Sequence, residues 1–423
     1  MSPNNRPSIC KPDEQNCIAL TSRMHVDVGG YNYRPDTAAT VPQRLDSGIN
    51  VRRARIGILG TFMGDWNYNL SFEFGGSSDG LGGLAPGSLP GGVTTGIHDA
   101  QVGYTGLKPF TIEGGIAALP YTLDWATSSN DTMFMERSSA ATIAANSLGA
   151  GSFRTHAGIR GNNDRLWAGV YLTGPTLGAT HIGSSTATVT GTTEQYGSFG
   201  RLTYQLVQGE TYSLHIGGDA QAVFKPPTNT TTGVPTLTLS DRPELRIDPT
   251  AILTTGAIAN ASAAQVYSAE AAAGHGPLFF QGEYLHFNID RRLGLPTLQF
   301  AGWYVQGSWT LTGESRAYNP STGSYGTIVP AHPFVTNSNE WGAWELAGRY
   351  SVIDLNDRLG FKDGIAGGDQ TVYTVGLNWY VNRNVKFMFN YLHGIIDKQA
   401  SGVLATNTGA RFDALAMRAQ VWC

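Results

Sequence analysis

Alternating apolar and polar residues form the strongest pattern in this chain. Residues 66–74 read WNYNLSFEF, so every second side chain is aromatic or aliphatic and those between are polar. Successive side chains of a β-strand point to opposite faces, and a period of two therefore separates the two sets. The segment predicts a strand with one apolar and one hydrophilic face.

The same alternation recurs along the chain, clearly in residues 20–33, 50–62, 371–381 and 385–394. Further strands, bounded by Gly, Asn, Asp or Pro, are predicted near residues 97–106, 109–118, 152–161, 164–174, 195–207, 210–224 and 236–248. In residues 50–62, strict alternation puts Arg53 and Arg55 on the hydrophilic face and turns Arg52 to the apolar face, unless a bulge lies between them.

The connections between these segments distinguish a barrel from tandem sandwiches. Residues 64–65 and 382–384 form tight turns, and residues 75–96, 120–150, 226–236 and 314–340 form long polar connections. Outer-membrane barrels combine short periplasmic turns with longer outer loops, and they place Trp and Tyr near the membrane interfaces, as at Trp66, Trp379 and Tyr380. The pattern predicts an all-β transmembrane antiparallel barrel of 16 strands, with residues 20–423 as one unit.

Composition agrees with a sheet that has one lipid-facing side. Charged residues make up 14% of the 423 residues, against roughly 25% in soluble domains, and the chain contains 54 glycines. No stretch of about 18 apolar residues occurs, so helical membrane spans are excluded. The net charge of -4 argues against nucleic acid as a partner. The 28 basic residues comprise 22 Arg and 6 Lys, which suits oxyanion binding, although a compositional bias of the genome would give the same excess.

The N-terminal segment, residues 1–19, is polar and contains two of the three cysteines. Cys10 and Cys17 are close enough in sequence to form a small disulfide loop in an oxidising compartment, and a metal site there is less favoured because only His25 is near. The segment lacks a signal-peptide pattern, so we expect that a signal peptide was removed and an initiator Met added. We expect no cofactor and no metal.

Six strings in the chain resemble the phosphate-selective porin O and P family. They are LTSRMHVDVGGYNY, RRARIG, WNYNLSFEF, LDWATSSNDTMFMERS, SDRPELRID and the pair WTLTGESRAY and GAWELAGRYS, and they cover the chain from about residue 20 to its end. The resemblance implies a trimeric, 16-stranded outer-membrane porin with a loop folded into the lumen, here residues 120–150, and with an arginine ladder that guides anions.

Carried onto this chain, the resemblance makes Ser128, Ser129 and Arg137 residues of the constriction loop. It places ladder arginines at Arg52, Arg53, Arg242 and Arg246, of which we rank Arg53 above Arg52; alternation adds Arg55, Arg201 and Arg349. The chain departs from the family's pattern at Asp124, where phosphate-selective members carry a lysine and where an acid would repel phosphate. It also ends in Cys423 rather than in an aromatic residue.

The residues alone leave alternatives open. The inward arginines could instead pair with Glu73, Glu244, Glu345 and Asp219 and serve only to keep the lumen rigid and hydrated. We predict an outer-membrane porin that passes small anionic or neutral solutes with a preference for anions, as a homotrimer in contact with outer-membrane lipids. A non-selective porin, an enzymatic barrel and a soluble multi-sandwich binding protein are the alternatives, and no HExxH motif supports the enzyme.

Overall fold

The protein is a closed β-barrel in a computed structural model that describes residues 6–12, 15–36, 44–75, 96–148, 154–176, 195–209, 211–229, 231–399 and 408–423. Sixteen long strands form its wall: β2 (Cys17–Pro35), β3 (Gly48–Phe62), β4 (Trp66–Glu73), β5 (Gly96–Tyr104), β6 (Phe110–Ala117), β7 (Arg154–Asn162), β8 (Leu166–Thr176), β9 (Tyr196–Gln208), β10 (Tyr212–Lys225), β15 (Ala261–His275), β16 (Leu278–Arg291), β17 (Leu298–Thr310), β20 (Ala343–Asp357), β21 (Ile365–Asn382), β22 (Val385–Asp397) and β23 (Ala410–Trp422).

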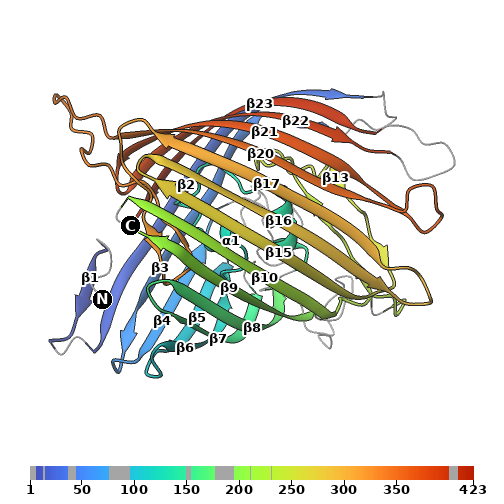
Figure 1. The fold of residues 1–423 in the computed structure, drawn as a ribbon, viewed down its shortest axis with the longest axis horizontal. Helices are drawn as coiled ribbons and strands as arrows, with labels where there is room; N and C mark the ends of the chain where they lie inside the picture. Colours follow the sequence, from blue (N-terminus) through green and yellow to red (C-terminus); the bar gives the residue numbers. More distant parts are fainter. Residues whose placement is uncertain are drawn as a thin grey trace.

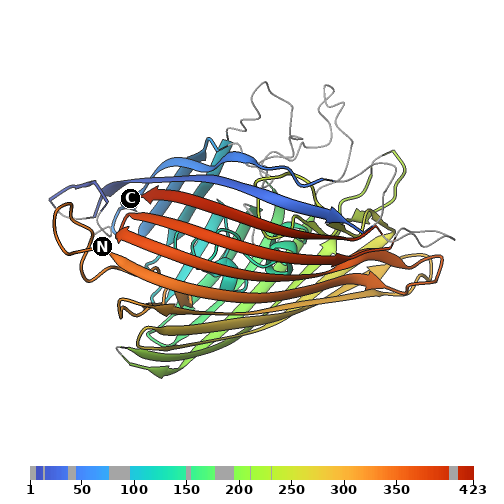
Figure 2. The ribbon, with the colours of Figure 1, turned by 90° about the horizontal axis from the view of Figure 1, so that it is seen from above.

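Each wall strand is antiparallel to its neighbours in the sequence, and the last strand pairs with the first. The β2–β23 pairing runs from Arg23 opposite Trp422 to Pro35 opposite Ala410. Figures 1 and 2 show the resulting tilted barrel, with the two chain ends close together at one rim. Closure removes the unpaired sheet edges that lipid could not satisfy. The structure confirms the predicted 16-stranded transmembrane barrel.

Alternation along each strand separates an outer apolar face from an inner one. In β23, Leu415 is 69% exposed, whereas its neighbours Ala414 and Ala416 are 1% and 7% exposed. In β22, Lys386 and Asn390 are buried inside and Phe389 is exposed outside. Neither helix in the described residues is long and apolar enough to cross a membrane.

A β-bulge in β3 corrects the prediction that Arg52 faces outward. His25 pairs with Arg53 and Val26 pairs with Val51, so Arg52 has no opposite residue on β2. An extra residue of this kind shifts the alternation by one position. Arg52 and Arg53 are consequently both directed inward, and they are 3% and 5% exposed.

The predicted wall strand at residues 236–248 is wrong. These residues belong to the connection between β10 and β15, which contains only the two-residue strands β11 (Thr236–Leu237), β12 (Ser240–Asp241), β13 (Leu253–Thr254) and β14 (Ile258–Ala259). Pro243 supplies no backbone N–H for a sheet, and Glu244 has a positive φ of 51°. Leu237, Leu239 and Leu253 instead join a buried apolar cluster with the inward side chains of the wall.

The long connection at residues 311–342 lies at the opposite end from the one we predicted. It joins β17 to β20, and the alternating strand directions place it at the same rim as the tight turns and both termini. It contains β18 (Tyr318–Asn319) and β19 (Ser324–Tyr325). Arg316 donates to the carbonyl oxygen of Asp131 at 2.9 Å, so this connection reaches from the terminal rim to the segment between β6 and β7.

The segment between β6 and β7 contains two helices, α1 (Leu123–Ala126) and α2 (Ser139–Asn146). Thr122 and Ser138 cap their N-termini through side-chain oxygens. Residues 139–145 of α2 are all buried, because they pack against inward side chains of the wall and against the β10–β15 connection. Both helices lie within the outline of the barrel in both views (Figures 1 and 2).

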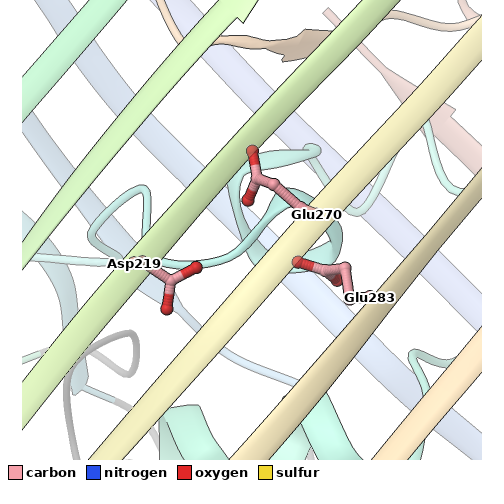
Figure 3. A group of neighbouring side chains, drawn as sticks. All are labelled: Asp219, Glu270 and Glu283. Atoms are coloured by element: carbon pink, nitrogen blue, oxygen red, sulfur yellow. The ribbon is translucent and has the colours of Figure 1, made fainter.

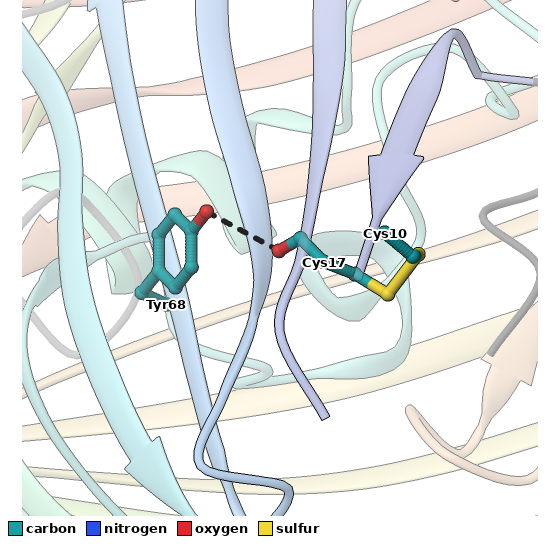
Figure 4. The surroundings of a disulfide bond; sticks show 3 residues. All are labelled: Cys10, Cys17 and Tyr68. Atoms are coloured by element: carbon teal, nitrogen blue, oxygen red, sulfur yellow. Dashed lines mark hydrogen bonds between the residues drawn. A yellow bond between two sulfur atoms is a disulfide. The ribbon is translucent and has the colours of Figure 1, made fainter. Parts of the chain in front are cut away.

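The N-terminal segment pairs with the first wall strand near the terminal rim. Strand β1 (Ser8–Cys10) runs antiparallel to β2, with Cys10 opposite Cys17, and a disulfide joins these two residues. Tyr68 donates a hydrogen bond to the carbonyl oxygen of Cys17 at 3.3 Å (Figure 4). The bridge fixes the hairpin against the barrel.

The disulfide determines how many cysteines can be alkylated before and after reduction. Cys423 is the free cysteine. We expect the denatured protein to take up one alkyl group without reductant and three after reduction, as read by intact mass. Three groups without reductant would contradict the bridge.

Candidate pore and constriction site

A polar space with a cavity volume of about 310 Å³ lies between strands β2 to β5 and the segment of residues 118–148. Six guanidinium groups line it, together with two carboxylates, those of Glu73 and Asp99. Ser128 and Ser129 come from the segment between β6 and β7, and most of the contributors from the wall are inward side chains. The lining arginines are Arg6, Arg23, Arg52, Arg53, Arg55 and Arg137.

Arg23 connects the wall to the two predicted loop serines. Its Nη1 donates to Ser129 Oγ at 2.5 Å and its Nη2 to Ser128 Oγ at 3.2 Å. No carboxylate lies within ion-pair distance of Arg23 in the described residues. The positive charge of Arg23 is therefore offset only by hydroxyl oxygens at close range.

Arg53 also lacks a carboxylate partner among the residues that the structure describes. Its Nη1 donates to His25 Nδ1 at 3.3 Å, and its Nε has no hydrogen-bond partner. His25 Nε2 lies 3.1 Å from Asn130 Oδ1, so a ring that accepts at Nδ1 and donates at Nε2 satisfies both contacts. Those contacts suit a neutral His25 and leave the charge of Arg53 uncompensated.

Arg137 lines the same space but is held by the backbone of its own segment. Its Nε donates to the carbonyl oxygen of Asp124 at 2.7 Å and its Nη2 to that of Thr127 at 2.5 Å. Its guanidinium lies 4.6 Å from the ring centre of Trp125. In the described residues no carboxylate is within 4 Å of its nitrogens, so these contacts orient the cation without neutralising it.

The predicted repulsive role of Asp124 does not fit its position. Asp124 is not among the residues that line the polar space, and it is 3% exposed. Its Oδ2 accepts the backbone N–H of Ser138 at 3.2 Å, next to the start of α2. Burial raises the pKa of Asp124, although Arg137 and Arg349 act in the opposite direction. The side chain joins the two ends of the segment and does not face the pore space.

Five of the other predicted arginines form ion pairs. Arg201 and Arg349 on the wall and Arg246 on the β10–β15 connection do not line the polar space. Arg242 lies on that same connection rather than on a wall strand. The closest pairs are Arg52 with Glu136 at 2.7 Å, Arg55 with Glu73 at 2.5 Å, Arg201 with Glu270 at 2.7 Å, Arg246 with Asp241 at 2.5 Å and Arg349 with Glu244 at 2.6 Å.

Inward wall side chains satisfy the irregular backbone of residues 127–137. Lys386 Nζ donates to the carbonyl oxygen of Thr132 at 2.7 Å, and Asn378 Nδ2 donates to that of Met133 at 2.8 Å. Asn390 Oδ1 accepts the N–H of Met135 at 2.9 Å, and Arg349 Nη1 donates to the carbonyl oxygen of Glu136. Buried backbone groups need such partners, so these contacts hold the segment in place.

Glu136 is the charged anchor of this segment. It accepts two hydrogen bonds from Arg52 at 2.7 and 2.9 Å and one from Arg418 at 2.7 Å. Although burial acts to raise it, Arg52 and Arg418 hold the pKa of Glu136 well below its usual range. Arg418 also forms a bidentate pair with Asp27 at 2.7 Å, which ties the segment to the seam between β2 and β23.

The sequence prediction omitted two arginines that line the polar space, Arg23 and Arg6. Alternation already placed Arg23 on the hydrophilic face of its strand, and that signal could have identified it. Arg6 precedes the first strand, and only the paired β1 hairpin brings it to the space.

Comparison with known proteins identifies the family. The family described as phosphate-selective porin O and P matches residues 18–422. This chain belongs to that family. It is an outer-membrane porin of bacteria, and its fold is that of a channel. Porin O of Pseudomonas aeruginosa is 30% identical over 138 residues, which make up 31% of this porin and 30% of that protein, so the aligned part spans under a third of the relative's length.

Solved structures with little sequence identity share the fold. OmpT of Vibrio cholerae superposes with a TM-score of 0.53 at 10% identity, covering 98% of this porin and 100% of that chain. An anion-selective porin from Comamonas acidovorans gives 0.51 at 12% identity, covering 98% and 100%. DcaP of Acinetobacter baumannii gives 0.51 at 10% identity, covering 98% and 99%. These structural similarities show that the chain has the porin barrel fold.

Proposed function

We propose that this porin conducts small anions in preference to cations through the polar space beside β2 to β5, with residues 118–148 as its constriction loop. The observation that carries the proposal is the set of three guanidinium groups, those of Arg23, Arg53 and Arg137, that face one space without close carboxylate partners in the described residues. The family's description as phosphate-selective supports the same sign of preference.

The physical basis is the field of fixed charges beside a narrow water path. A unit charge about 4 Å from an ion interacts by about 1 kcal/mol at the dielectric constant of water, and by more beside a protein wall. Three neighbouring cations would lower the entry cost of an anion, and several sites of modest strength would still release it. Ser128 and Ser129 add hydroxyl groups next to Arg23 that could hydrogen-bond a passing oxyanion.

The carboxylates of Glu73 and Asp99 are expected to make the preference for anions weaker than the arginines alone would make it. Both line the same space, where Glu73 pairs with Arg55 and Asp99 accepts from Ser71 and His98 at 2.7 Å. A non-selective porin is the second candidate function on this observation. Trimeric assembly is part of the proposal, supported by the trimer form recorded for the Vibrio cholerae protein.

Reversal potential in planar bilayers tests the proposal. With a KCl gradient across the membrane, we expect the zero-current potential to have the sign of chloride permeating faster than potassium. Replacing chloride by phosphate then measures whether an oxyanion permeates as well. A potential near zero would favour the non-selective porin, and a potential that shows potassium to be the more permeant ion would overturn the anion preference.

A further inference from the structure

Three carboxylates meet inside the barrel wall, away from the arginine-lined space. Asp219 on β10, Glu270 on β15 and Glu283 on β16 point to the same side of three adjacent strands (Figure 3). One oxygen from each lies within 4.8 Å of the others, and the three residues are 7%, 4% and 3% exposed. Glu270 and Glu283 are directly opposite each other in the strand register, a destabilising arrangement for two like charges.

The positive charge around the cluster is too small to balance it. Arg201 forms a bidentate pair with Glu270, and His215 contributes a ring nitrogen 2.8 Å from Glu270 Oε1. Glu283 accepts the N–H groups of Leu123 and Asp124 and the hydroxyl of Tyr304, all of which are uncharged donors. Three ionised carboxylates face the guanidinium of Arg201 and the imidazole of His215, which leaves an excess of negative charge in a buried place.

Two buried oxygen atoms beside the cluster lack a well-formed hydrogen bond. Tyr121, fully buried on the constriction loop, contacts Asp219 through its phenol and lies near Glu283, but the contact is too poorly aligned to satisfy its hydroxyl. Asp219 Oδ1 is also buried and without a partner. A buried hydroxyl and a buried carboxylate oxygen each lose the stabilisation of water when no ligand or partner replaces it.

We propose that Asp219, Glu270, Glu283 and the phenol oxygen of Tyr121 bind one calcium ion, which joins the constriction loop to the barrel wall. All the donors are oxygen atoms, which suit a hard divalent cation, and its positive charge offsets the excess negative charge. Calcium accepts an irregular set of carboxylate oxygens, whereas magnesium requires near-octahedral geometry and retains several waters. Gly217 leaves the room that the Glu270 carboxylate occupies, since a Cβ there would lie 2.6 Å from Oε1.

Binding of the metal to the full-length porin in detergent tests the site directly. After treatment with EDTA and its removal, we expect titration calorimetry with calcium chloride to show one ion bound per chain, with a Kd of about 1 mM or tighter. Terbium as a luminescent probe is expected to be sensitised by tyrosine, because Tyr121 and Tyr304 lie next to the carboxylates. Absence of saturable binding of either probe would overturn the proposal.

Variants separate this site from other acids of the lumen. We expect Asp219→Asn to weaken calcium binding at least tenfold, and Tyr121→Phe to weaken it several-fold while leaving the charge of the wall unchanged. Glu113→Gln is the matched control, because Glu113 is also an inward acid bound by a tyrosine hydroxyl, that of Tyr171. The alternative is that the carboxylates share a proton and bind no calcium. In that case Asp219→Asn and Tyr121→Phe will take up as much calcium as wild type, and the proposal fails.

The outcome is independent of the proposed ion preference. Calcium binding is measured in detergent without any current, so a porin that binds one calcium ion but favours potassium would refute the proposed function alone. Conversely, an anion-preferring porin with no calcium uptake would refute the calcium site alone.

Discussion

Replacing Arg23 and Arg53 with glutamine is expected to cause the largest loss of anion preference of any pair of substitutions in this porin. Each side chain faces the polar space, and neither has a carboxylate within ion-pair distance in the described residues. A unit charge about 4 Å from the ion path contributes about 1 kcal/mol even at the dielectric constant of water. We therefore expect each single variant to lower the chloride-to-potassium permeability ratio about fivefold, and the double variant to lower it further.

Reversal potential in asymmetric KCl measures this ratio for each variant. Arg165→Gln is the control, because it removes the same charge from an exposed turn between β7 and β8. Screening over a Debye length of about 10 Å at 0.1 M salt limits the influence of such a surface charge on the pore. If Arg165→Gln changes the ratio as much as Arg53→Gln does, the preference arises from overall charge and not from this space.

Arg349→Ala provides a further comparison within the lumen. Arg349 is paired with Glu244 and donates to the backbone of the constriction loop, whereas Arg137 lines the polar space. We expect Arg137→Ala to lower the permeability ratio more than Arg349→Ala does. Equal effects would count against the assignment of Arg137 to the ion path.

The wall of the barrel was predictable because one physical rule governs each strand. A side chain that faces lipid must be apolar and its neighbour need not be, so the alternation in residues 66–74 and 371–381 shows which side chains face inward. Arg53, Arg201 and Arg349 were correctly placed inside on that basis. The bulge at Arg52 was not predictable, because strict alternation assumes that every residue has an opposite partner.

Two connections were predicted wrongly, for different reasons. Residues 236–248 alternate in hydrophobicity for a few positions, and this alternation predicted a wall strand. The connection around residues 314–340 is long and polar, and its length alone predicted the outer rim. Pro243 was the available signal against a wall strand, since proline cannot donate to a sheet. Sequence alternation also contains no information on how two connections fold back into the lumen, because their partners are side chains of distant strands.

The ion pairs explain why candidate pore arginines could not be ranked from sequence. Arg201, Arg246 and Arg349 each have a carboxylate partner that is at least five residues away in sequence, and for Arg349 the partner lies on the β10–β15 connection. Only the three-dimensional contacts distinguish these structural cations from Arg23 and Arg53. The hypothesis that inward acids neutralise the arginines therefore holds for the paired arginines, which include Arg52 and Arg55 in the polar space, and not for Arg23, Arg53 and Arg137.

Replacing Glu136 with glutamine is expected to release the constriction loop and raise both conductance and anion preference. Glu136 is bound by Arg52 and Arg418, and removing one partner of a buried ion pair costs about 3–5 kcal/mol. Loss of the Glu136 charge weakens the contacts that hold residues 127–137. It also leaves the positive charges of Arg52 and Arg418 less neutralised inside the lumen. The porin variant should therefore pass more current than wild type. On SDS gels of samples heated to increasing temperatures, it should change from the folded to the unfolded band at a lower temperature.

The pH dependence of the same anchor follows from its depressed pKa. Arg52 and Arg418 hold the pKa of Glu136 well below its usual range. The ion pairs of Glu136 therefore stabilise the loop at every pH above the ordinary glutamate pKa of about 4.3. This stabilisation is lost only as the pH falls through the lower pKa that Glu136 has in the folded protein. Wild-type conductance is expected to stay constant from neutral pH down to the ordinary glutamate pKa of about 4.3. Glu113→Gln removes an inward acid that accepts hydrogen bonds from the wall residues Arg160 and Tyr171, so it is expected to leave conductance unchanged. A Glu136→Gln porin with the conductance and ion preference of wild type would show that residues 118–148 do not set the width of the pore.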